Sequence, residues 1–296
     1  MPDQNKKLLS IGFVTYNGGV RIRRALDSLF SQTYGNFELI ISDNASTDET
    51  PDICREYVER DTRARYIRQP ENIGRINNFL FVLKKARGDY FMWAANDDWW
   101  DPRFAAVLIA GLEKHRDCGV ALSSFKRVYI SGEALDEISF AGENSTINKS
   151  RYALYKKIAL YNPAHIFFCG IWRIDFLRDL TRRQIPGCRS WDRILMAEAA
   201  LVAGFYSADE FLFEKTKNRI SLKIRHLGDV EQNRLFKPFS YLRYIFTFLW
   251  WMISSPVVPL SRKIFILWPW LALVWIERKR IFGVTLRDAR RLLARK

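Results

Sequence analysis

The sequence predicts an α/β fold in which a mostly parallel central sheet carries helices on both faces, followed by a separate helical segment at the C-terminus. Strand-like and helix-like segments alternate over the first 130 residues, and polar clusters follow the strands. Strands that alternate with helices pair in parallel through right-handed crossovers. The composition then changes after residue 220, so we expect two domains, residues 1–220 and residues 221–296.

Hydrophobic periodicity predicts the individual elements of the first domain. The expected strands cover residues 8–16, 37–42, 64–68, 89–94 and 119–130. The expected helices cover residues 20–30, a segment through Tyr57 that Ser46 or Thr47 caps, residues 73–86, residues 102–115 and residues 151–160. A further helix is expected from Ser190, as its N-cap, to Ala203, with Gly204 as its C-cap, whereas residues 131–150 read as a loop.

Polar clusters follow three of the predicted strands at the points where the strands end. They are residues 15–17, 43–48 and 96–98. In an open parallel sheet, ligands bind at the carboxyl ends of the strands. We therefore expect the three clusters to converge on one edge of the sheet and to form a binding site there.

Two adjacent carboxylates, Asp97 and Asp98, lie in the third cluster. Two carboxylates held close together in a loop favour a bound cation, and hard oxygen ligands favour Mg²⁺ or Mn²⁺, which binds substrate phosphates. Such a cation would neutralise a diphosphate leaving group as charge develops on it. The alternative is a solvated acidic turn that caps the next helix.

Asp43 ends a predicted buried strand and opens the polar run to Asp48. A carboxylate at that position can accept hydrogen bonds from a base or a ribose. The alternative is a helix-capping turn, because Ser, Thr and Asp side chains commonly bond to nearby backbone groups.

Four motifs occur in a recognisable order over residues 8–220: Thr15-Tyr16-Asn17, Asp43 to Asp48, Pro70-Glu71-Asn72-Ile73-Gly74, and Asn96-Asp97-Asp98. In this order the chain resembles the family-2 glycosyltransferases, inverting enzymes with a Rossmann-like GT-A fold. The resemblance implies a nucleotide-sugar donor site, in which Asp43 contacts the base and Asp97 holds the cation through the diphosphate. The implied donor-binding residues are Thr15, Tyr16, Asn17, Asp43, Asn44, Asn72, Gly74, Asn96 and Asp97, with Asp97 and Asp98 as metal ligands. Many relatives carry an earlier Asp where this chain has Ala95 and Asn96, which leaves the relative roles of Asp97 and Asp98 open.

The family also implies a general base, an Asp or Glu at the start of a helix in the second half of the domain. Asp192 fits this position, and Glu198, almost two turns further on, is the weaker candidate. Asp192 can alternatively be a first-turn acid that the helix dipole favours. Trp172-Arg173 matches a family stretch that lines the acceptor side, with core and surface packing as the alternative. Lys215, Lys217 and Arg219 follow a position where relatives place basic residues over the donor phosphates, with a solvated charge run as the alternative. We interpret His165 as structural.

The C-terminal segment differs in charge and composition from the rest of the chain. Residues 221–296 carry a net charge of +11, and residues 239–276 contain 11 aromatic residues, five of them Trp. Their two apolar stretches are short or interrupted by Pro, whereas a bilayer span needs about 20 apolar residues. We expect a helical hairpin on an anionic membrane surface at the cytoplasmic face of the plasma membrane, which places a lipid-linked saccharide acceptor within reach.

Two other classes of function remain open. A nucleotide-sugar-forming nucleotidyltransferase would carry a Gly-rich phosphate loop with Lys in the first strand–helix turn, and residues 17–21 match this poorly. The second class is a basic protein that binds nucleic acid or lipid without catalysis. Only the tail supports this class, and its cations flank apolar stretches, so we expect no nucleic-acid partner.

The three histidines have no HxxxH spacing, which disfavours a zinc site. The four scattered cysteines favour reduced thiols, and the N-terminus does not indicate a secretory signal.

Overall fold

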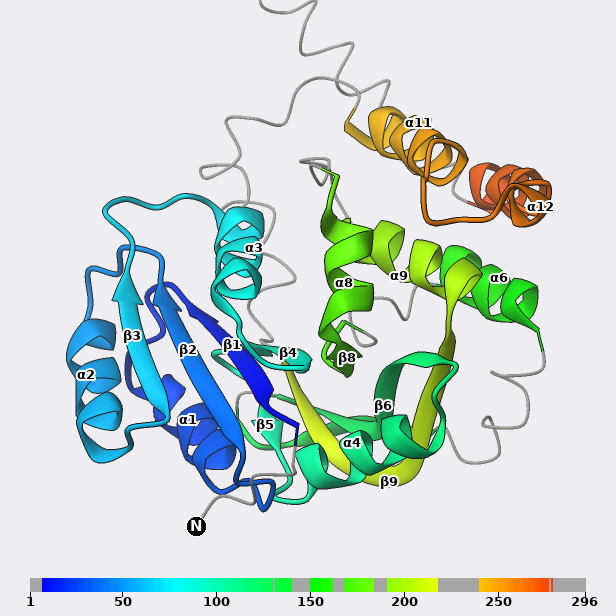
Figure 1. Cartoon of the computed structure of the whole chain (residues 1–296). Coiled ribbons are helices and arrows are strands. Elements are labelled where there is room, and N and C mark those ends of the chain that lie inside the picture. Colours follow the sequence, from blue (N-terminus) through cyan, green and yellow to red (C-terminus); the bar gives the residue numbers. More distant parts are fainter. Residues whose placement is uncertain are drawn as a thin grey trace, which may run out of the picture. The chain divides into compact units, whose positions relative to one another are not determined.

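The computed structural model describes residues 7–129, 131–139, 150–161, 168–183, 191–217, 240–276 and 278. The chain divides into two compact units and passes between them repeatedly. The first unit is made of residues 1–146, 169–178 and 205–217, and the second of residues 147–168, 179–204 and 218–296. Figure 1 shows the described elements in sequence colours, with the α/β sheet in the first unit and helices in the second.

The first unit contains a nine-stranded sheet in the order β3-β2-β1-β4-β8-β6-β9-β5, with β7 paired to β6. Strands β3, β2, β1 and β4 pair in parallel, whereas β8 pairs antiparallel with both β4 and β6, and β5 pairs antiparallel with β9. The sheet is therefore mixed, and its parallel part is limited to the first four strands along the chain. The strands are β1 (Leu9–Thr15), β2 (Phe37–Asp43), β3 (Ala64–Arg68), β4 (Tyr90–Ala95), β5 (Trp99–Trp100), β6 (Cys118–Tyr129), β7 (Ala134–Ile138), β8 (Ile171–Arg173) and β9 (Gly204–Lys217).

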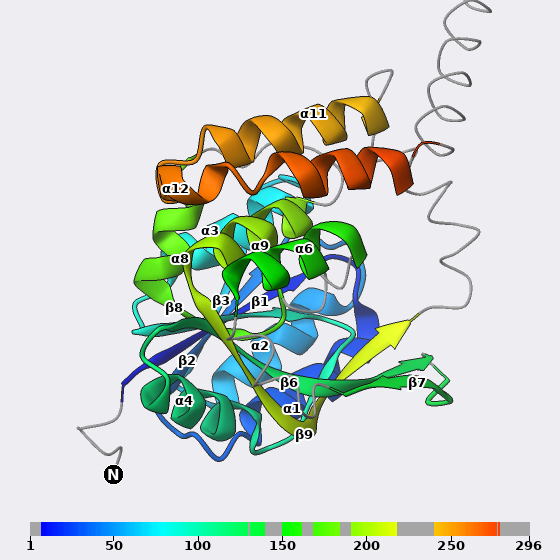
Figure 2. The ribbon, with the colours of Figure 1, turned by 90° about the vertical axis from the view of Figure 1, so that its right-hand side faces the viewer.

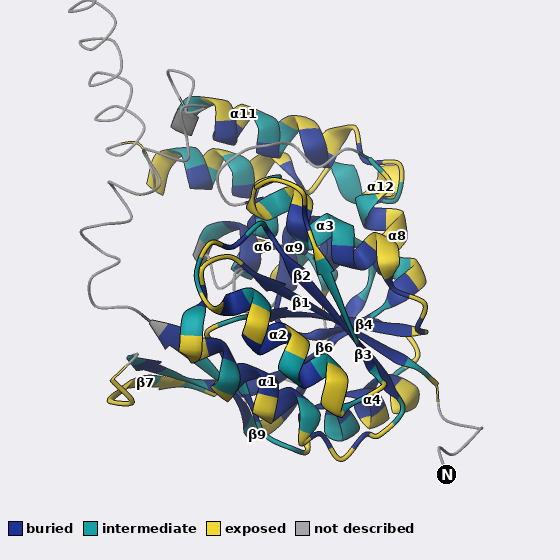
Figure 3. Cartoon of the chain, turned by 90° about the vertical axis from the view of Figure 1, so that its left-hand side faces the viewer, coloured by how far each residue is buried: buried dark blue, intermediate teal, exposed yellow. Residues whose placement is uncertain are grey.

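Helices cover both faces of the parallel strands (Figure 3). The chain moves outward from β1 to β2 and β3 and then returns to β4 on the other side of β1. Right-handed crossovers therefore place α1 and α2 on one face and α3 on the other. Every residue of β1 and β2 is buried, as expected for parallel strands covered on both sides. The helices are α1 (Ile22–Phe30), preceded by the 3₁₀ turn η1 (Gly19–Arg21), α2 (Thr50–Arg60), α3 (Arg75–Lys85) and α4 (Phe104–Lys114).

Gly12 in the middle of β1 allows α3 to approach the sheet closely. A Cβ atom at this position would lie 2.6 Å from Val82 Cγ2 on α3 and 2.8 Å from Phe91 Cζ on β4. Both neighbours are buried, so neither can move aside freely. The missing side chain therefore sets the distance between α3 and the two strands whose ends carry the polar clusters.

Three local predictions from the sequence were wrong. Helix α2 begins at Thr50, and neither Ser46 nor Thr47 caps it; Asp48 Oδ1 instead accepts the Thr50 amide hydrogen at 3.1 Å. Residues 131–150 are not entirely loop, because β7 pairs with β6. Gly204 does not merely end a helix but starts the 14-residue strand β9.

The second unit is helical, and α9 (Trp191–Val202) is buried along most of its length. Helices α6 (Arg151–Tyr161) and α11 (Ser240–Ile253) contact α9, and α8 (Ile174–Thr181) joins the two units along the chain. After α11, the short helix α12 (Leu260–Lys263) leads into a helix over residues 267–276, which runs beside α11 (Figure 2). Trp270 Nε1 donates a hydrogen bond to the Ile245 carbonyl at 2.9 Å, so the two helices form a hairpin.

A buried carboxylate ties this hairpin to α9. Glu198 has no exposed surface, and its two oxygens accept hydrogen bonds from Arg183 Nη2 and Trp251 Nε1, each at 2.6 Å. The Arg183 guanidinium also lies 3.8 Å from the centre of the Trp251 ring. Burial raises the pKa of the Glu198 carboxyl, and its hydrogen-bond donors oppose that rise. Residues of the C-terminal segment are therefore part of the packed second unit.

The close approach at Gly12 predicts a stability effect. Gly12→Ala should lower the free energy of unfolding by about 1–3 kcal/mol, because the added methyl group overpacks the contact with Val82. A Val82→Ala background should reduce this penalty, since it removes the clashing methyl groups. Urea denaturation followed by circular dichroism measures both effects. Gly35→Ala is the matched control, because a Cβ there meets no atom within 4 Å; equal losses at the two glycines would contradict the packing argument.

Candidate active site

The carboxyl ends of β1, β2 and β4 lie at the same level of the sheet. Thr15 pairs with Asp43 across β1 and β2, and Val14 pairs with Ala95 across β1 and β4. The Asn44 amide donates to the Thr15 carbonyl at 2.9 Å, and Asn96 Nδ2 donates to Thr15 Oγ1 at 3.0 Å. The three polar clusters thus meet at the point where the strand order reverses, where open α/β sheets bind ligands.

The loops after β1 and β2 are joined through Asn17. Its backbone amide donates to Ser46 Oγ at 2.9 Å, and its Oδ1 atom accepts the Thr47 amide hydrogen at 2.9 Å. Asn17 (φ 47°) and Ala45 (φ 65°) both adopt the left-handed region, which is costly for residues other than glycine. Such backbone strain is concentrated at functional sites, where surrounding contacts hold it. Here the hydrogen bonds between the loops after β1 and β2 hold the strained backbone.

Asp43 lies beneath this pair of loops and has no exposed surface. Its Oδ1 atom accepts the Ser46 amide hydrogen at 2.9 Å, and its Oδ2 atom accepts the Tyr66 hydroxyl at 2.7 Å. Arg68 Nε lies 3.8 Å from the same Oδ2 atom. Burial and the nearby Asp43 carboxylate raise the pKa of Tyr66. In this arrangement Asp43 orders the loop, and its carboxylate has no exposed surface for a direct contact with a base.

Asn44 connects this loop to the segment before α3. Its Nδ2 atom donates to Asn72 Oδ1 at 2.8 Å, and its Oδ1 atom accepts the Ile73 amide hydrogen at 2.9 Å. Gly74 has φ 82°, and a Cβ there would meet open space, so glycine is required by the backbone conformation rather than by a neighbour. Asn72 and Gly74 are exposed, whereas Asn44 is buried.

The two adjacent carboxylates after β4 lie in different environments. Asp97 is exposed, while Asp98 is 1% exposed. The Asp98 Oδ2 atom lies 2.6 Å from Lys215 Nζ, and its Oδ1 atom accepts the Thr216 amide hydrogen at 3.1 Å. Burial raises the pKa of Asp98 to about 7, an effect that Lys215 opposes and Asp97 reinforces. Both oxygens of Asp98, which the sequence predicts as a metal ligand, are bound by residues of β9.

The exposed Asp97 carboxylate fits a cation that arrives with a diphosphate. Mg²⁺ and similar ions keep several waters and use one or two carboxylates together with substrate phosphates. Within the described parts of the chain, no three His, Cys, Asp or Glu side chains gather as a metal-binding group. An exposed carboxylate such as Asp97 suits a cation site that is shared with a substrate phosphate.

The candidate bases Asp192 and Glu198 belong to the second unit. Asp192 lies in the first turn of α9, is half-buried, and its Oδ1 atom accepts the Arg193 amide hydrogen at 2.9 Å. Glu198 is fully buried and bound to Arg183 and Trp251, so Asp192 is the more accessible carboxylate. The structure brings the predicted donor-side residues together in the first unit, whereas Asp192 is on a helix of the second.

The remaining sequence candidates have mixed outcomes. Trp172 is completely buried in β8, and Arg173 Nε donates to the Cys118 carbonyl at 3.0 Å, so both support the fold. His165, Ser190 and Arg219 lie outside the described residues, as does the side chain of Lys217. Sequence reasoning missed Tyr66 and Arg68, which hold Asp43; their position on the neighbouring strand β3 was the available signal.

Comparison with known sequences identifies relatives with named activities. Putative glycosyltransferase EpsH of Bacillus subtilis is 33% identical over 102 residues, which cover 34% of this chain and 29% of EpsH. Putative teichuronic acid biosynthesis glycosyltransferase TuaG of the same organism is 28% identical over 141 residues, covering 48% of this chain and 56% of TuaG. This chain therefore spans less than two thirds of the length of either relative.

Solved structures share the fold at low sequence identity. S. aureus TarS 1-349 in complex with UDP-GlcNAc has a TM-score of 0.69 and 21% identity, with 91% of this chain and 73% of that chain covered. Mannosyltransferase PcManGT from Pyrobaculum calidifontis, in complex with GDP-Man and Mn²⁺, has a TM-score of 0.55 and 15% identity, covering 98% and 86%.

The family profile described as Glycosyl transferase family 2 matches residues 10–177, which include all four motifs at the sheet edge. The match covers more than half of the chain. This chain therefore belongs to glycosyl transferase family 2 and has the α/β architecture of the GT-A fold.

Proposed function

We propose that the protein is an inverting glycosyltransferase that moves a sugar from a nucleotide-sugar of the UDP type to a hydroxyl group of a lipid-linked saccharide in cell-surface polysaccharide biosynthesis. The observation that carries this proposal is the set of exposed polar groups over a buried hydrogen-bond network where β1, β2 and β4 end. The UDP-GlcNAc complex of TarS and the named role of TuaG support the donor and the pathway.

The donor-binding residues divide into contacting and supporting groups by their exposure. Tyr16, Asn17, Asn72, Gly74 and Asp97 are exposed and can contact the nucleotide and its diphosphate. Thr15, Asp43 and Asn44 are buried and Asn96 is half-buried, and each is hydrogen-bonded to another loop of the site. We assign these four residues to positioning the contacting residues, which would limit the reorganisation on binding.

The transfer is a single displacement. The acceptor hydroxyl gives its proton to the Asp192 carboxylate while its oxygen attacks the anomeric carbon opposite the diphosphate. The bond between that carbon and the diphosphate oxygen breaks, and the electron pair leaves with the nucleoside diphosphate, so the configuration inverts. Asp97 would hold Mg²⁺ or Mn²⁺, which would supply positive charge to the departing diphosphate.

The metal role of Asp97 predicts a loss of activity on chelation. EDTA should abolish transfer, and added Mn²⁺ should restore it. Asp97→Ala should lower turnover by about 10²–10³-fold, the size expected when one stabiliser of developing negative charge is removed. Asp52→Asn on the exposed surface of α2 is the control and should retain full activity. Undiminished transfer in rigorously metal-free buffer would refute this role.

The base role of Asp192 predicts a separation of binding from turnover. Asp192→Asn should lower turnover by about 10²–10⁴-fold, the usual contribution of a general base, while UDP binding measured by calorimetry stays unchanged. Glu198→Gln is the contrasting variant: it weakens the charge-assisted contact with Arg183 and should lower the midpoint of thermal unfolding. Near-normal turnover of Asp192→Asn would restrict Asp192 to a helix-start role.

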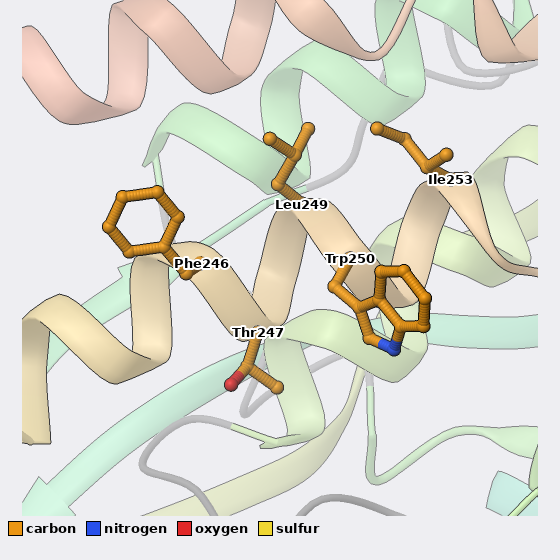
Figure 4. Close-up of a pocket in the computed structure, with 5 residues that line it drawn as sticks. All are labelled: Phe246, Thr247, Leu249, Trp250 and Ile253. Atoms are coloured by element: carbon orange, nitrogen blue, oxygen red, sulfur yellow. The ribbon is translucent and has the colours of Figure 1, made fainter.

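We also propose that the hairpin of α11 and residues 267–276 lies on the anionic cytoplasmic face of the membrane. Figure 4 shows an apolar groove on α11 lined by Phe246, Thr247, Leu249, Trp250 and Ile253. Residues 239–276 contain no acidic residue, and Arg243 and Arg278 are exposed. No helix among the described residues has the length and hydropathy needed to cross a bilayer. The exposed large hydrophobic residues of the hairpin are Phe246, Trp250, Ile253, Leu260, Ile264, Phe265, Leu267, Trp268, Leu271, Trp275 and Ile276.

The exposed tryptophans of the hairpin predict how the protein binds vesicles. Burial of apolar surface contributes about 25 cal/mol per Å², whereas each nearby cation adds about 1 kcal/mol on an anionic surface. A Trp250→Ala/Trp268→Ala variant should therefore float less with anionic liposomes, and high salt should weaken wild-type binding only partly. Leu135→Ala, at an exposed apolar position in β7, is the control. If the double variant changes the oligomeric state and leaves liposome flotation unchanged, a second copy of the chain covers this surface.

A further inference from the structure

The loop between β4 and β5 separates two adjacent carboxylates that would otherwise repel each other. The Asp97 side chain is exposed, and the Asp98 side chain has no exposed surface. Both Asp98 oxygens are bound by consecutive residues of β9, namely the Lys215 ammonium and the Thr216 amide. Next to these residues, β9 pairs with β5, and Trp99 lies opposite Glu214.

Lys215 therefore differs from the solvated cation that a basic run suggests. Its side chain is only 16% exposed, and its ammonium lies 2.6 Å from Asp98 Oδ2. An ammonium committed to a buried carboxylate has limited capacity to follow a mobile phosphate. The contact joins residues 117 positions apart in the sequence, so it fixes the loop after β4 to a distant strand.

We propose that Lys215 is a positioning residue for the metal-binding Asp97. It keeps Asp98 turned into the protein, so that one carboxylate of the pair faces the diphosphate side of the site. This inference rests on the proposed function, in which Asp97 holds the cation. It adds a role for a residue outside the four sequence motifs and explains why an adjacent acidic pair presents a single exposed carboxylate.

The chemistry of the buried ion pair explains why the orientation of Asp97 depends on Lys215. Removal of one partner from a buried ion pair leaves the other charge without compensation. In Lys215→Met, the Asp98 Oδ2 atom loses the ammonium that binds it at 2.6 Å. The loop after β4 then loses the contact that holds Asp97 in its present orientation. Residues that orient metal ligands in this way typically change metal affinity by about 10–100-fold when they are replaced.

A double-mutant cycle in the full chain tests the proposal. The variants are Lys215→Met, Asp98→Asn and the combination of both, with Lys126→Met as the control because Lys126 forms an exposed ion pair with Glu137 on the same sheet. Electron paramagnetic resonance measures Mn²⁺ binding in the presence of UDP. Calorimetry measures UDP binding without metal, and thermal unfolding reports stability.

Lys215→Met should weaken Mn²⁺ binding by about 10–100-fold. UDP binding without metal should change much less. The double variant should recover most of the lost Mn²⁺ affinity, because Asn at position 98 still accepts the Thr216 amide hydrogen and leaves no buried charge. This recovery is the readout that distinguishes positioning from direct action, and it remains available if Lys215→Met alone folds poorly.

Two results would overturn the inference. Equal losses of Mn²⁺ affinity in Lys215→Met and in the double variant would mean that the ammonium acts directly on the phosphates. Unchanged Mn²⁺ affinity in Lys215→Met, with lower stability, would mean that the pair only supports the fold. Failure of the unsubstituted chain to bind Mn²⁺ and UDP together would instead refute the proposed function, so the two failures are distinguishable.

Discussion

The parallel register of β1 with its two neighbours is the constraint on which the site depends. Because Thr15 lies opposite Asp43 and Val14 lies opposite Ala95, three strands end at the same level, and each delivers a polar loop there. The strand order reverses at β1, so the crossover helices lie on opposite faces and leave the carboxyl ends of β1 and β4 open. The close approach of α3 at Gly12 maintains this arrangement from one face. The sheet thus creates the location of the site before any individual side chain contributes chemistry.

The side chains at this edge have two kinds of role, which their burial separates. Asp43, Asn44 and Thr15 are buried, and their hydrogen bonds join the loops to one another. Buried polar groups are stabilising only when they are bonded, and here the bonds also determine the loop conformations. The strained backbone of Asn17 and Ala45 persists because these contacts surround it. Because the supporting residues are ordered, the exposed groups already have a defined arrangement before a ligand binds. This preorganisation lowers the entropic cost of binding.

The parallel strands were predictable from the sequence, and the residues that complete the site were not. Strand β2 was predicted to within one residue of its observed bounds, Phe37–Asp43, because an apolar run that a polar turn follows indicates a strand. Strands β5 and β8 are two and three residues long, which is too short for an alternation of apolar and polar residues to be recognised in the sequence. The partner of Asp98 was missed for a different reason. Adjacent carboxylates look equivalent in a sequence, and only the return of β9 to the edge of the sheet makes one buried and the other exposed.

One helix of the second unit, α9, carries the proposed general base and also contacts the hairpin that we propose binds the membrane. Asp192 is the second residue of helix α9, and Glu198 lies about one and two-thirds turns later. Glu198 binds Arg183 and Trp251, so α11 is fastened to α9 by a buried carboxylate as well as by apolar packing. A buried ion pair adds little net stability compared with a well-packed apolar contact, but its geometry is directional. Trp251 faces inward to this contact, and its neighbour Trp250 is 70% exposed. The orientation of α11 that satisfies Glu198 therefore also determines which aromatic side chains remain outside.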